Sequence, residues 1–133
     1  MRGDAPLLAV VDDDADVRIA LMRLFASAGI DAEGFATGAE FLRSIEHHRP
    51  DCVVLDLHMP GMSGFDVQGA LAKSGAAIPV VVITGHDTQE ARARALQLGA
   101  KDYLPKPVDH DALLAAIESA MRGGARRTPP RDR

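Results

Sequence analysis

Acidic side chains follow two apolar stretches of the chain, at the point where each stretch ends. Asp56 closes the apolar run 52–55, and the pair Asp12 and Asp13 follows the apolar run 7–11. An unpaired carboxylate is costly to take out of water, so such groups are normally paired, metal-bound or functional. Two strand-like runs that end in carboxylates therefore predict one pocket that binds a divalent cation.

A hydroxyl and an amine occupy matching positions later in the chain. Thr84 follows the apolar run 79–83, and Lys106 follows the short run 101–104. Two carboxylates about 4 Å apart repel by roughly 4 kcal/mol at an effective dielectric constant near 20, and Mg²⁺ relieves this while leaving positions for phosphate oxygens. Carboxylates, a cation, a lysine and a hydroxyl together describe phosphoryl transfer onto Asp56.

The elements that must position these residues alternate along the chain. Periodicity predicts strands over 7–11, 31–35, 52–56, 79–83 and 101–104, and helices over 14–28, 37–45, 65–73, 87–98 and 109–121. Asp14 is expected to cap the first helix, and Thr37 with Glu40 has the spacing of a capping box. Strict alternation predicts a parallel sheet covered by helices on both faces. Ligands bind at the carboxyl ends of such strands, where the acidic residues lie.

Composition limits the class of protein. The chain has 133 residues, 47% of them hydrophobic and 26% charged, which fits one globular domain. Net charge is −4, but the last twelve residues hold five Arg and one Asp, so the remainder carries −8. This acidic body argues against direct nucleic-acid binding. The single cysteine forms no internal disulfide, and no apolar run approaches membrane-spanning length, so we expect a cytoplasmic protein. We expect the domain to cover residues 6–121. Residues 122–133 are expected to form a flexible basic tail or linker.

The motifs, taken in order, resemble those of one family. They are Asp12-Asp13, Asp56 with Met-Pro-Gly-Met-Ser-Gly at 59–64, Thr84-Gly85, Tyr103 and Lys106-Pro107. Each motif alone is unspecific, but each follows a predicted strand in the expected order. The sequence resembles the receiver domain of two-component response regulators over about residues 6–121. The resemblance implies a flavodoxin-like (βα)5 fold with strand order 2-1-3-4-5.

The resemblance also implies a role for each site residue. Asp56 would accept a phosphoryl group from a phosphohistidine on a sensor histidine kinase or phosphotransfer protein. Asp12, Asp13, Asp56 and the backbone carbonyl of His58 would hold Mg²⁺, for which Mn²⁺ can substitute. Lys106 would contact the phosphoryl oxygens, and a cis bond is expected between it and Pro107.

The expected output is a change of surface rather than turnover of a separate substrate. Thr84 and Tyr103 would act as switch residues and alter the face formed by residues 87–98, 101–104 and 109–121. That face would form a homodimer on phosphorylation or bind a downstream target, with transcription as one output. His58 and His86 flank the site and could orient water.

Two alternatives from other classes fit these residues less well. A phosphatase or phosphotransferase with an aspartyl nucleophile would place its nucleophile after the first strand, with a second Asp two residues on, whereas position 58 is His. The spacing of Asp12, Asp14 and Asp16 imitates a calcium-binding loop, but such a loop needs Gly at its sixth position and Glu at its twelfth. Val17 and Arg23 stand there, which excludes that loop.

Overall fold

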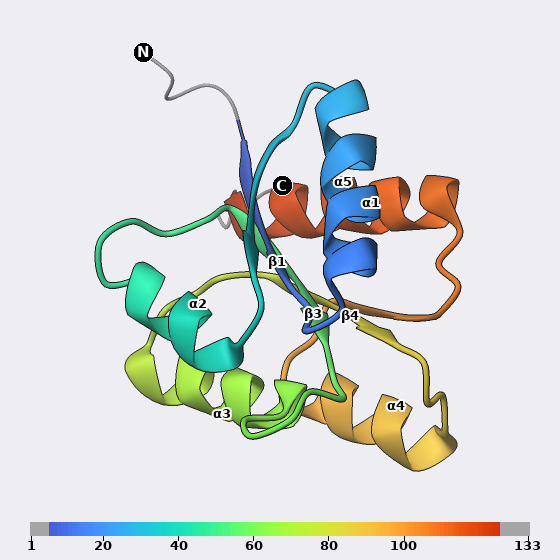
Figure 1. Ribbon diagram of the computed structural model, residues 1–133. Coiled ribbons are helices and arrows are strands. Elements are labelled where there is room, and N and C mark those ends of the chain that lie inside the picture. Colours follow the sequence, from blue (N-terminus) through green and yellow to red (C-terminus); the bar gives the residue numbers. More distant parts are fainter. Residues whose placement is uncertain (1–5, 126–133) are drawn as a thin grey trace, which may run out of the picture.

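A computed structural model describes residues 6–125, and within them five strands alternate with five helices (Figure 1). The elements are β1 (Leu7–Val11), α1 (Ala15–Ser27), β2 (Asp31–Phe35), α2 (Gly38–Ser44), β3 (Cys52–Asp56), α3 (Gly64–Ser74), β4 (Val80–Thr84), α4 (Gln89–Gln97), β5 (Asp102–Pro105) and α5 (His110–Ala125). All neighbouring strands are parallel, in the order β2-β1-β3-β4-β5. The predicted fold class and strand order are therefore confirmed.

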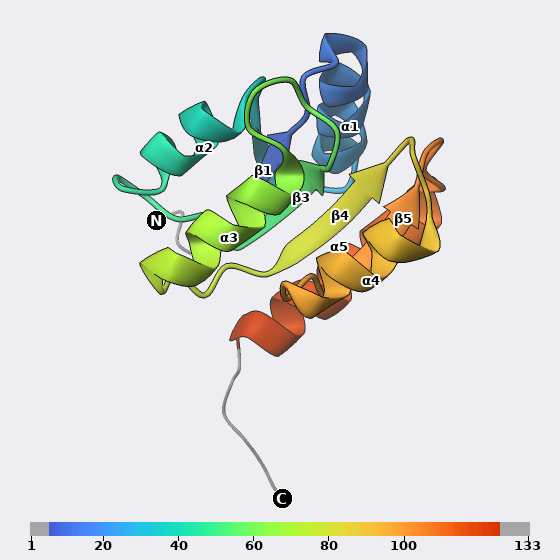
Figure 2. The same cartoon turned by 90° about the horizontal axis from the view of Figure 1, so that it is seen from below.

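Two helical layers cover the sheet because the central strands are apolar on both faces. α1 and α5 lie on one face, and α2, α3 and α4 lie on the other (Figures 1 and 2). Along β3, Cys52 and Val54 pack with the buried side chains beneath α1 and α5, whereas Val53 and Leu55 pack with those beneath α2, α3 and α4. β1 and β4 alternate in the same way, so the core is split into two clusters by the sheet.

Several element boundaries differ from the sequence predictions by one to four residues. β4 and β5 each begin and end one residue later than predicted, which places Thr84 inside β4, opposite Pro105. α4 begins at Gln89 because the Thr88 hydroxyl caps it, accepting the Ala91 N–H at 3.0 Å. α5 continues to Ala125, four residues beyond the predicted end. The remainder of the predicted tail, 126–133, lies outside the described residues.

Helix caps fix where α1 and α3 leave the edge of the sheet. Asp14 caps α1 as predicted, with its carboxylate accepting the N–H groups of Asp16 and Val17. The complete capping box belongs to α3 instead, where Ser63 and Asp66 bond to each other's backbone N–H groups. At Thr37 only half of the predicted box forms, since no bond from the Glu40 side chain returns to the cap.

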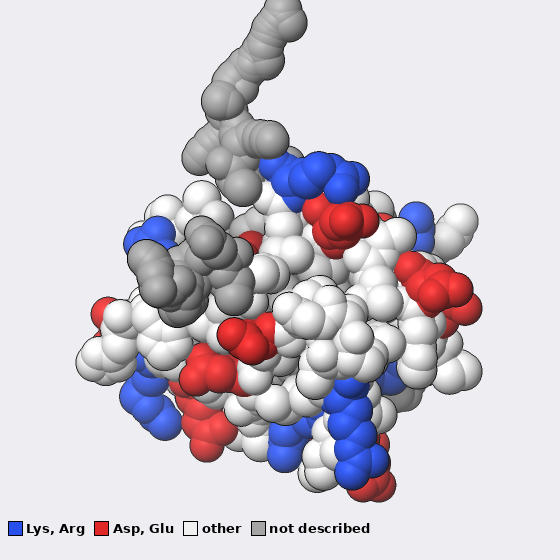
Figure 3. Space-filling view, turned by 90° about the horizontal axis from the view of Figure 1, so that it is seen from above, with Lys and Arg blue, Asp and Glu red and all other residues white. Residues whose placement is uncertain are grey.

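No described helix could span a membrane, and one face of the molecule shows no basic groove. Among residues 6–125, no helix combines the length and apolarity that crossing a bilayer requires. On the face seen in Figure 3, acidic and basic side chains of the described residues are interspersed. That face therefore lacks the continuous positive area that binding a phosphate backbone relies on.

Candidate functional site

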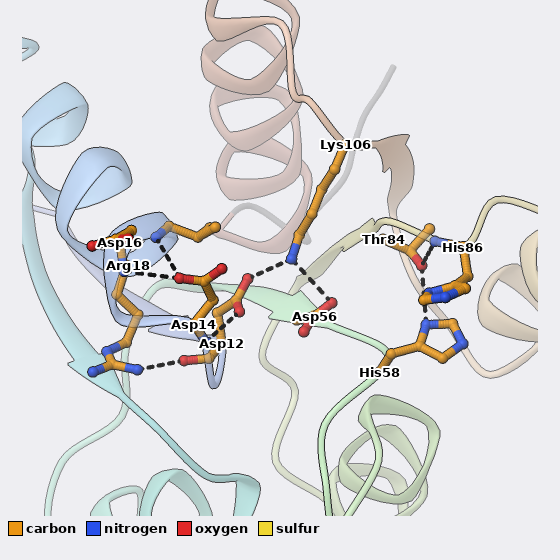
Figure 4. Close-up of polar contacts among 10 residues, drawn as sticks. Asp12, Asp14, Asp16, Arg18, Asp56, His58, Thr84, His86 and Lys106 are labelled. Atoms are coloured by element: carbon orange, nitrogen blue, oxygen red, sulfur yellow. Dashed lines mark hydrogen bonds and ion pairs between the residues drawn. The ribbon is translucent and has the colours of Figure 1, made fainter.

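The sheet brings side chains from four strands to one edge. The chain runs from β1 to β2 on one side of β1 and later adds β3 on its other side. The strand order therefore reverses between β1 and β3, and this position is the topological switch point. Asp12 directly follows β1, Asp56 ends β3, Thr84 ends β4, and Lys106 directly follows β5. Figure 4 shows Lys106 reaching between the two carboxylates, with Thr84 and His58 beyond Asp56.

Three carboxylates form a cluster that could hold a metal ion. One oxygen each from Asp12, Asp13 and Asp56 lies within 4.8 Å of the others. Asp12 is 0% exposed and Asp56 is 3% exposed, whereas Asp13 faces solvent. Asp12 Oδ1 accepts the N–H of Asp14 at 3.0 Å, but the equally buried Oδ2 accepts no hydrogen bond. Clustered carboxylate oxygens are the ligands that a hard cation binds, so the donor set fits such an ion.

Lys106 places a positive charge next to the carboxylate cluster. Its Nζ lies 2.9 Å from Asp12 Oδ2, an ion pair whose angle falls short of a hydrogen bond, and 3.4 Å from Asp56 Oδ1. Burial by itself would lower the pKa of Lys106, but attraction to the two carboxylates outweighs it and raises the pKa. Lys106 therefore stays charged. The bond between Lys106 and Pro107 is cis, as predicted.

The Asp56 carboxylate is held in an unfavourable environment. Burial and, second, the nearby charge of Asp12 raise the pKa of Asp56 from 3.8 to about 6, against the opposing effect of Lys106. One ammonium group therefore does not compensate two buried carboxylates. Further positive charge at the site would favour the ionised, nucleophilic form of Asp56.

The Thr84 hydroxyl is engaged on the side away from the carboxylates. Thr84 is fully buried, and its Oγ1 accepts the backbone N–H of His86 at 3.0 Å. The same oxygen lies 3.2 Å from Nδ1 of His58, whose ring packs against that of His86 with 4.3 Å between centroids. Partial loss of hydration, followed by the neighbouring His86 and Lys106, lowers the pKa of His58. These effects favour the neutral form of His58.

Tyr103 lies in the core of the sheet rather than among the carboxylates. Its ring is 2% exposed and belongs to the cluster beneath α2, α3 and α4, with the Arg92 guanidinium 5.4 Å from the ring centroid. Its hydroxyl is buried without a hydrogen-bond partner. Burial raises the pKa of Tyr103, and the charge of Asp87 adds to this although no hydrogen bond of normal geometry joins the two.

Two positioning features were missed by the sequence analysis. The Arg18 guanidinium on α1 donates to the backbone carbonyl of Asp12 at 2.7 Å and so holds the acidic loop. Gly64, at the start of α3, lies against the backbone of β3, because a Cβ atom there would be 2.4 Å from the carbonyl oxygen of Asp56. Spacing alone does not distinguish Arg18 from a solvated helix residue. Gly64, at the end of the 59–64 motif, could have indicated that the backbone of one segment lies close to another.

Together, fold and site define a flavodoxin-like α/β domain with an acidic cluster at its switch point. The chain belongs to the response regulator receiver domain family, whose family model matches residues 8–118. Receiver domains are signalling domains rather than enzymes that turn over a substrate, so the family assignment favours signalling over the aspartyl phosphatase alternative.

Individual relatives agree with this assignment. The chain is 37% identical over 123 residues to the DNA-binding transcriptional regulator NtrC of Escherichia coli, covering 92% of this chain and 26% of that protein. It is 36% identical over 122 residues to the response regulator protein TodT of Pseudomonas putida, covering 92% of this chain and 54% of that protein. The chain thus spans about a quarter to a half of these relatives' lengths. A CheY-like receiver domain from Methanospirillum hungatei superposes with a TM-score of 0.85 at 25% identity, covering 91% of this chain and 97% of that one.

Proposed function

We propose that this domain is a phosphorylation-dependent switch in which Asp56 receives a phosphoryl group from a phosphohistidine. The observation that carries the proposal is the nearly buried Asp56 carboxylate beside Asp12, with Lys106 Nζ 3.4 Å away at the carboxyl edge of the sheet. A carboxylate oxygen of Asp56 forms the new bond to phosphorus, and the phosphorus–nitrogen bond breaks. The electron pair stays on the imidazole nitrogen, which takes up a proton.

Asp12, Asp13 and Asp56, with the backbone carbonyl of His58, would hold Mg²⁺, or Mn²⁺ in its place. The burial of Asp12 and the spacing of the three carboxylate oxygens within 4.8 Å support this ligand set. Such an ion neutralises charge on the phosphoryl oxygens during transfer. Lys106 contacts one of those oxygens, because its ammonium already lies between Asp12 and Asp56.

The readout we propose runs through Thr84 and Tyr103. Thr84 ends β4 beside the site, and Tyr103 lies on the neighbouring strand opposite Val82. Phosphate on Asp56 would draw the Thr84 hydroxyl toward it, and the buried Tyr103 hydroxyl, which lacks a partner, would move with it. The surface formed by α4, β5 and α5 would then change and bind a second copy or a downstream target.

The partners follow from the same proposal. The donor is a sensor histidine kinase or a phosphotransfer protein in the cytoplasm. The NtrC relative is named a DNA-binding transcriptional regulator, so control of transcription is the output we favour for a protein that contains this domain. We assign no nucleic-acid contact to the domain itself.

Labelling with acetyl phosphate and Mg²⁺ tests the proposal. Intact mass should increase by one phosphoryl group, and Asp56→Asn should abolish the increase. Asp51→Asn is the matched control, because Asp51 is exposed at the opposite end of β3, where it accepts the Leu7 N–H at 2.8 Å. Equal labelling of Asp56→Asn and wild type would exclude Asp56 as the acceptor.

A further inference from the structure

The Thr84 hydroxyl has one proton and two polar neighbours, of which only one could accept that proton. The backbone N–H of His86 donates to Thr84 Oγ1 at 3.0 Å, so the oxygen already serves as an acceptor. The remaining close polar atom is Nδ1 of His58, at 3.2 Å. Since the backbone N–H can only donate, the acceptor that these two partners offer to the hydroxyl proton is Nδ1 of His58, in the tautomer that carries its own proton on Nε2.

We propose that the His58 side chain is a latch that holds the Thr84 hydroxyl away from Asp56 until phosphorylation. This inference rests on the proposed function, in which Thr84 donates to a phosphoryl oxygen. A single O–H cannot donate fully to His58 Nδ1 and to a phosphoryl group at once, so the two acceptors compete. His58 thereby sets how readily the site accepts phosphate, and it is a positioning residue because it acts through Thr84.

Neighbouring groups hold the His58 ring and the Thr84 backbone in place. The His86 ring packs on the His58 ring at a 47° angle, with 4.3 Å between centroids, which restricts rotation of His58. Thr84 itself is fully buried and its backbone pairs with β5, so its side chain is the part that can change direction. The His58 imidazole is close to solvent and can release the hydroxyl without disturbing the core.

Substitution of His58 tests the latch. His58→Leu removes the acceptor, and His58→Asn keeps an acceptor at the distance of Nδ1 from the backbone. At saturating Mg²⁺, we expect His58→Leu to increase both the affinity for beryllofluoride, a phosphoryl mimic, and the rate of labelling by acetyl phosphate. The expected gain is about twofold to tenfold, the equilibrium weight of one hydrogen bond. His58→Asn should remain within about twofold of wild type, by the same comparison.

A double-mutant cycle separates a latch from a simple steric gate. Thr84→Val removes the hydroxyl at nearly constant volume, so His58→Leu should have no effect in that background. A gain that persists without the hydroxyl, a gain of equal size in His58→Asn, or no gain in His58→Leu would each overturn the latch. Labelling of wild type at Asp56 in the same experiment shows that such a failure concerns the latch and leaves the proposed function standing.

An independent readout needs no phosphate. Long-range ¹H–¹⁵N correlation spectra report which nitrogen of a neutral imidazole carries the proton. We expect His58 in the phosphate-free protein to carry it on Nε2, with Nδ1 bare. A proton on Nδ1 would make Thr84 the acceptor from His58 and would refute the competition on which the latch depends.

Discussion

At the scale of single residues, the site is a concentration of negative charge that the fold does not fully compensate. Two buried carboxylates share one ammonium, and one buried oxygen of Asp12 accepts no hydrogen bond. Buried charge that is not fully compensated lowers the free energy of unfolding, so this arrangement of carboxylates reduces the stability of the fold. Three consequences can be measured on individual side chains.

The first concerns the pH dependence of stability. In the unfolded chain Asp56 releases its proton near pH 3.8, whereas in the folded, metal-free protein it holds the proton to about pH 6. The folded state therefore binds more protons in this window, and the free energy of unfolding contributed by Asp56 falls as pH rises from about 4 to about 6. Removing the charge with Asp56→Asn should stabilise the metal-free protein by up to about 3 kcal/mol above pH 7 and by little below pH 4.

Urea unfolding with a chelator, at pH 4, 5, 6 and 7, measures this difference. The gap between Asp56→Asn and wild type should widen with pH. A gap that is constant over this range would show that the Asp56 carboxylate is not destabilised by its surroundings. Adding Mg²⁺ at pH 7 should narrow the gap, since the ion compensates the charge in wild type alone.

The second consequence concerns the exposed member of the cluster. Attraction between a doubly charged cation and one carboxylate about 4 Å away is worth about 2 kcal/mol even at the dielectric constant of water. Asp13→Ala should therefore weaken Mg²⁺ affinity by on the order of tenfold or more, measured by titration calorimetry. Asp14→Asn is the control, because it removes an adjacent charge but preserves a cap for α1. Unchanged affinity in Asp13→Ala would remove Asp13 from the metal site.

The third consequence separates metal binding from phosphoryl transfer. Lys106 repels a cation and attracts a phosphoryl group, so Lys106→Ala should not reduce Mg²⁺ affinity but should slow labelling by acetyl phosphate about a hundredfold. Lys106→Arg, which keeps the charge, should recover part of the rate. Wild-type labelling kinetics in Lys106→Ala would show that the ammonium does not contact the transferring group.

At the scale of elements, α3 must approach β3 closely for Asp56 to sit where it does. A Cβ atom on Gly64 would lie 2.4 Å from Asp56 O and 2.8 Å from Leu57 Cα, both of which are backbone atoms that cannot yield cheaply. We expect Gly64→Ala to destabilise the protein by about 1–3 kcal/mol and to impair labelling of Asp56.

Gly69 provides the matched control within the same helix. A Cβ atom there meets no other atom within 4 Å, so Gly69→Ala should stabilise α3 by roughly 1 kcal/mol through helix propensity. Thermal or urea unfolding of both variants gives the comparison. Equal effects of the two substitutions would mean that the close approach at Gly64 does not position the site.

The sequence predicted the elements of this fold better than the contacts between them. Apolar runs predicted β1, β3 and β4 within one residue, because buried parallel strands are apolar throughout. β2 is mostly exposed, and its residues carry a weaker signal. The convergence of Asp12, Asp56, Thr84 and Lys106 was predictable because they lie at or next to strand ends, where topology brings distant segments together. The Thr84–His58 bond and the contact of Arg18 with Asp12 O depend on side-chain directions that no periodicity encodes. The same limit explains why half of the capping box predicted at Thr37 is missing.

At the scale of the whole molecule, α4 is the helix held least firmly over its face of the sheet. Its one buried residue is Ala95, whereas α3 buries four residues. Elements with few buried contacts open at low free energy and take part most readily in conformational change. A change at Thr84 and Tyr103 would therefore be expressed first in α4 and β5.

Hydrogen exchange of the phosphorylated protein can test where the change appears. We expect amides of α4 and β5 to change their exchange rates severalfold on treatment with acetyl phosphate and Mg²⁺, while amides of β2 and α2 do not. Asp56→Asn, treated in the same way, should show no difference. A change spread evenly over the sheet would contradict transmission through the α4 side of the molecule.

The two-sided core of the central strands has a consequence for how they find their alignment. In a sheet with one wet face, alternation of apolar and polar side chains penalises a strand that slips by one residue. β3 is apolar on both faces, so its hydrophobic residues tolerate such a slip. Its ends do not, because a shift would carry the exposed carboxylate of Asp51 into the sheet or move the Asp56 carboxylate away from Lys106. The acidic residues at the two ends of β3 thus limit its register, and the proposed phosphoacceptor also helps to align the strand.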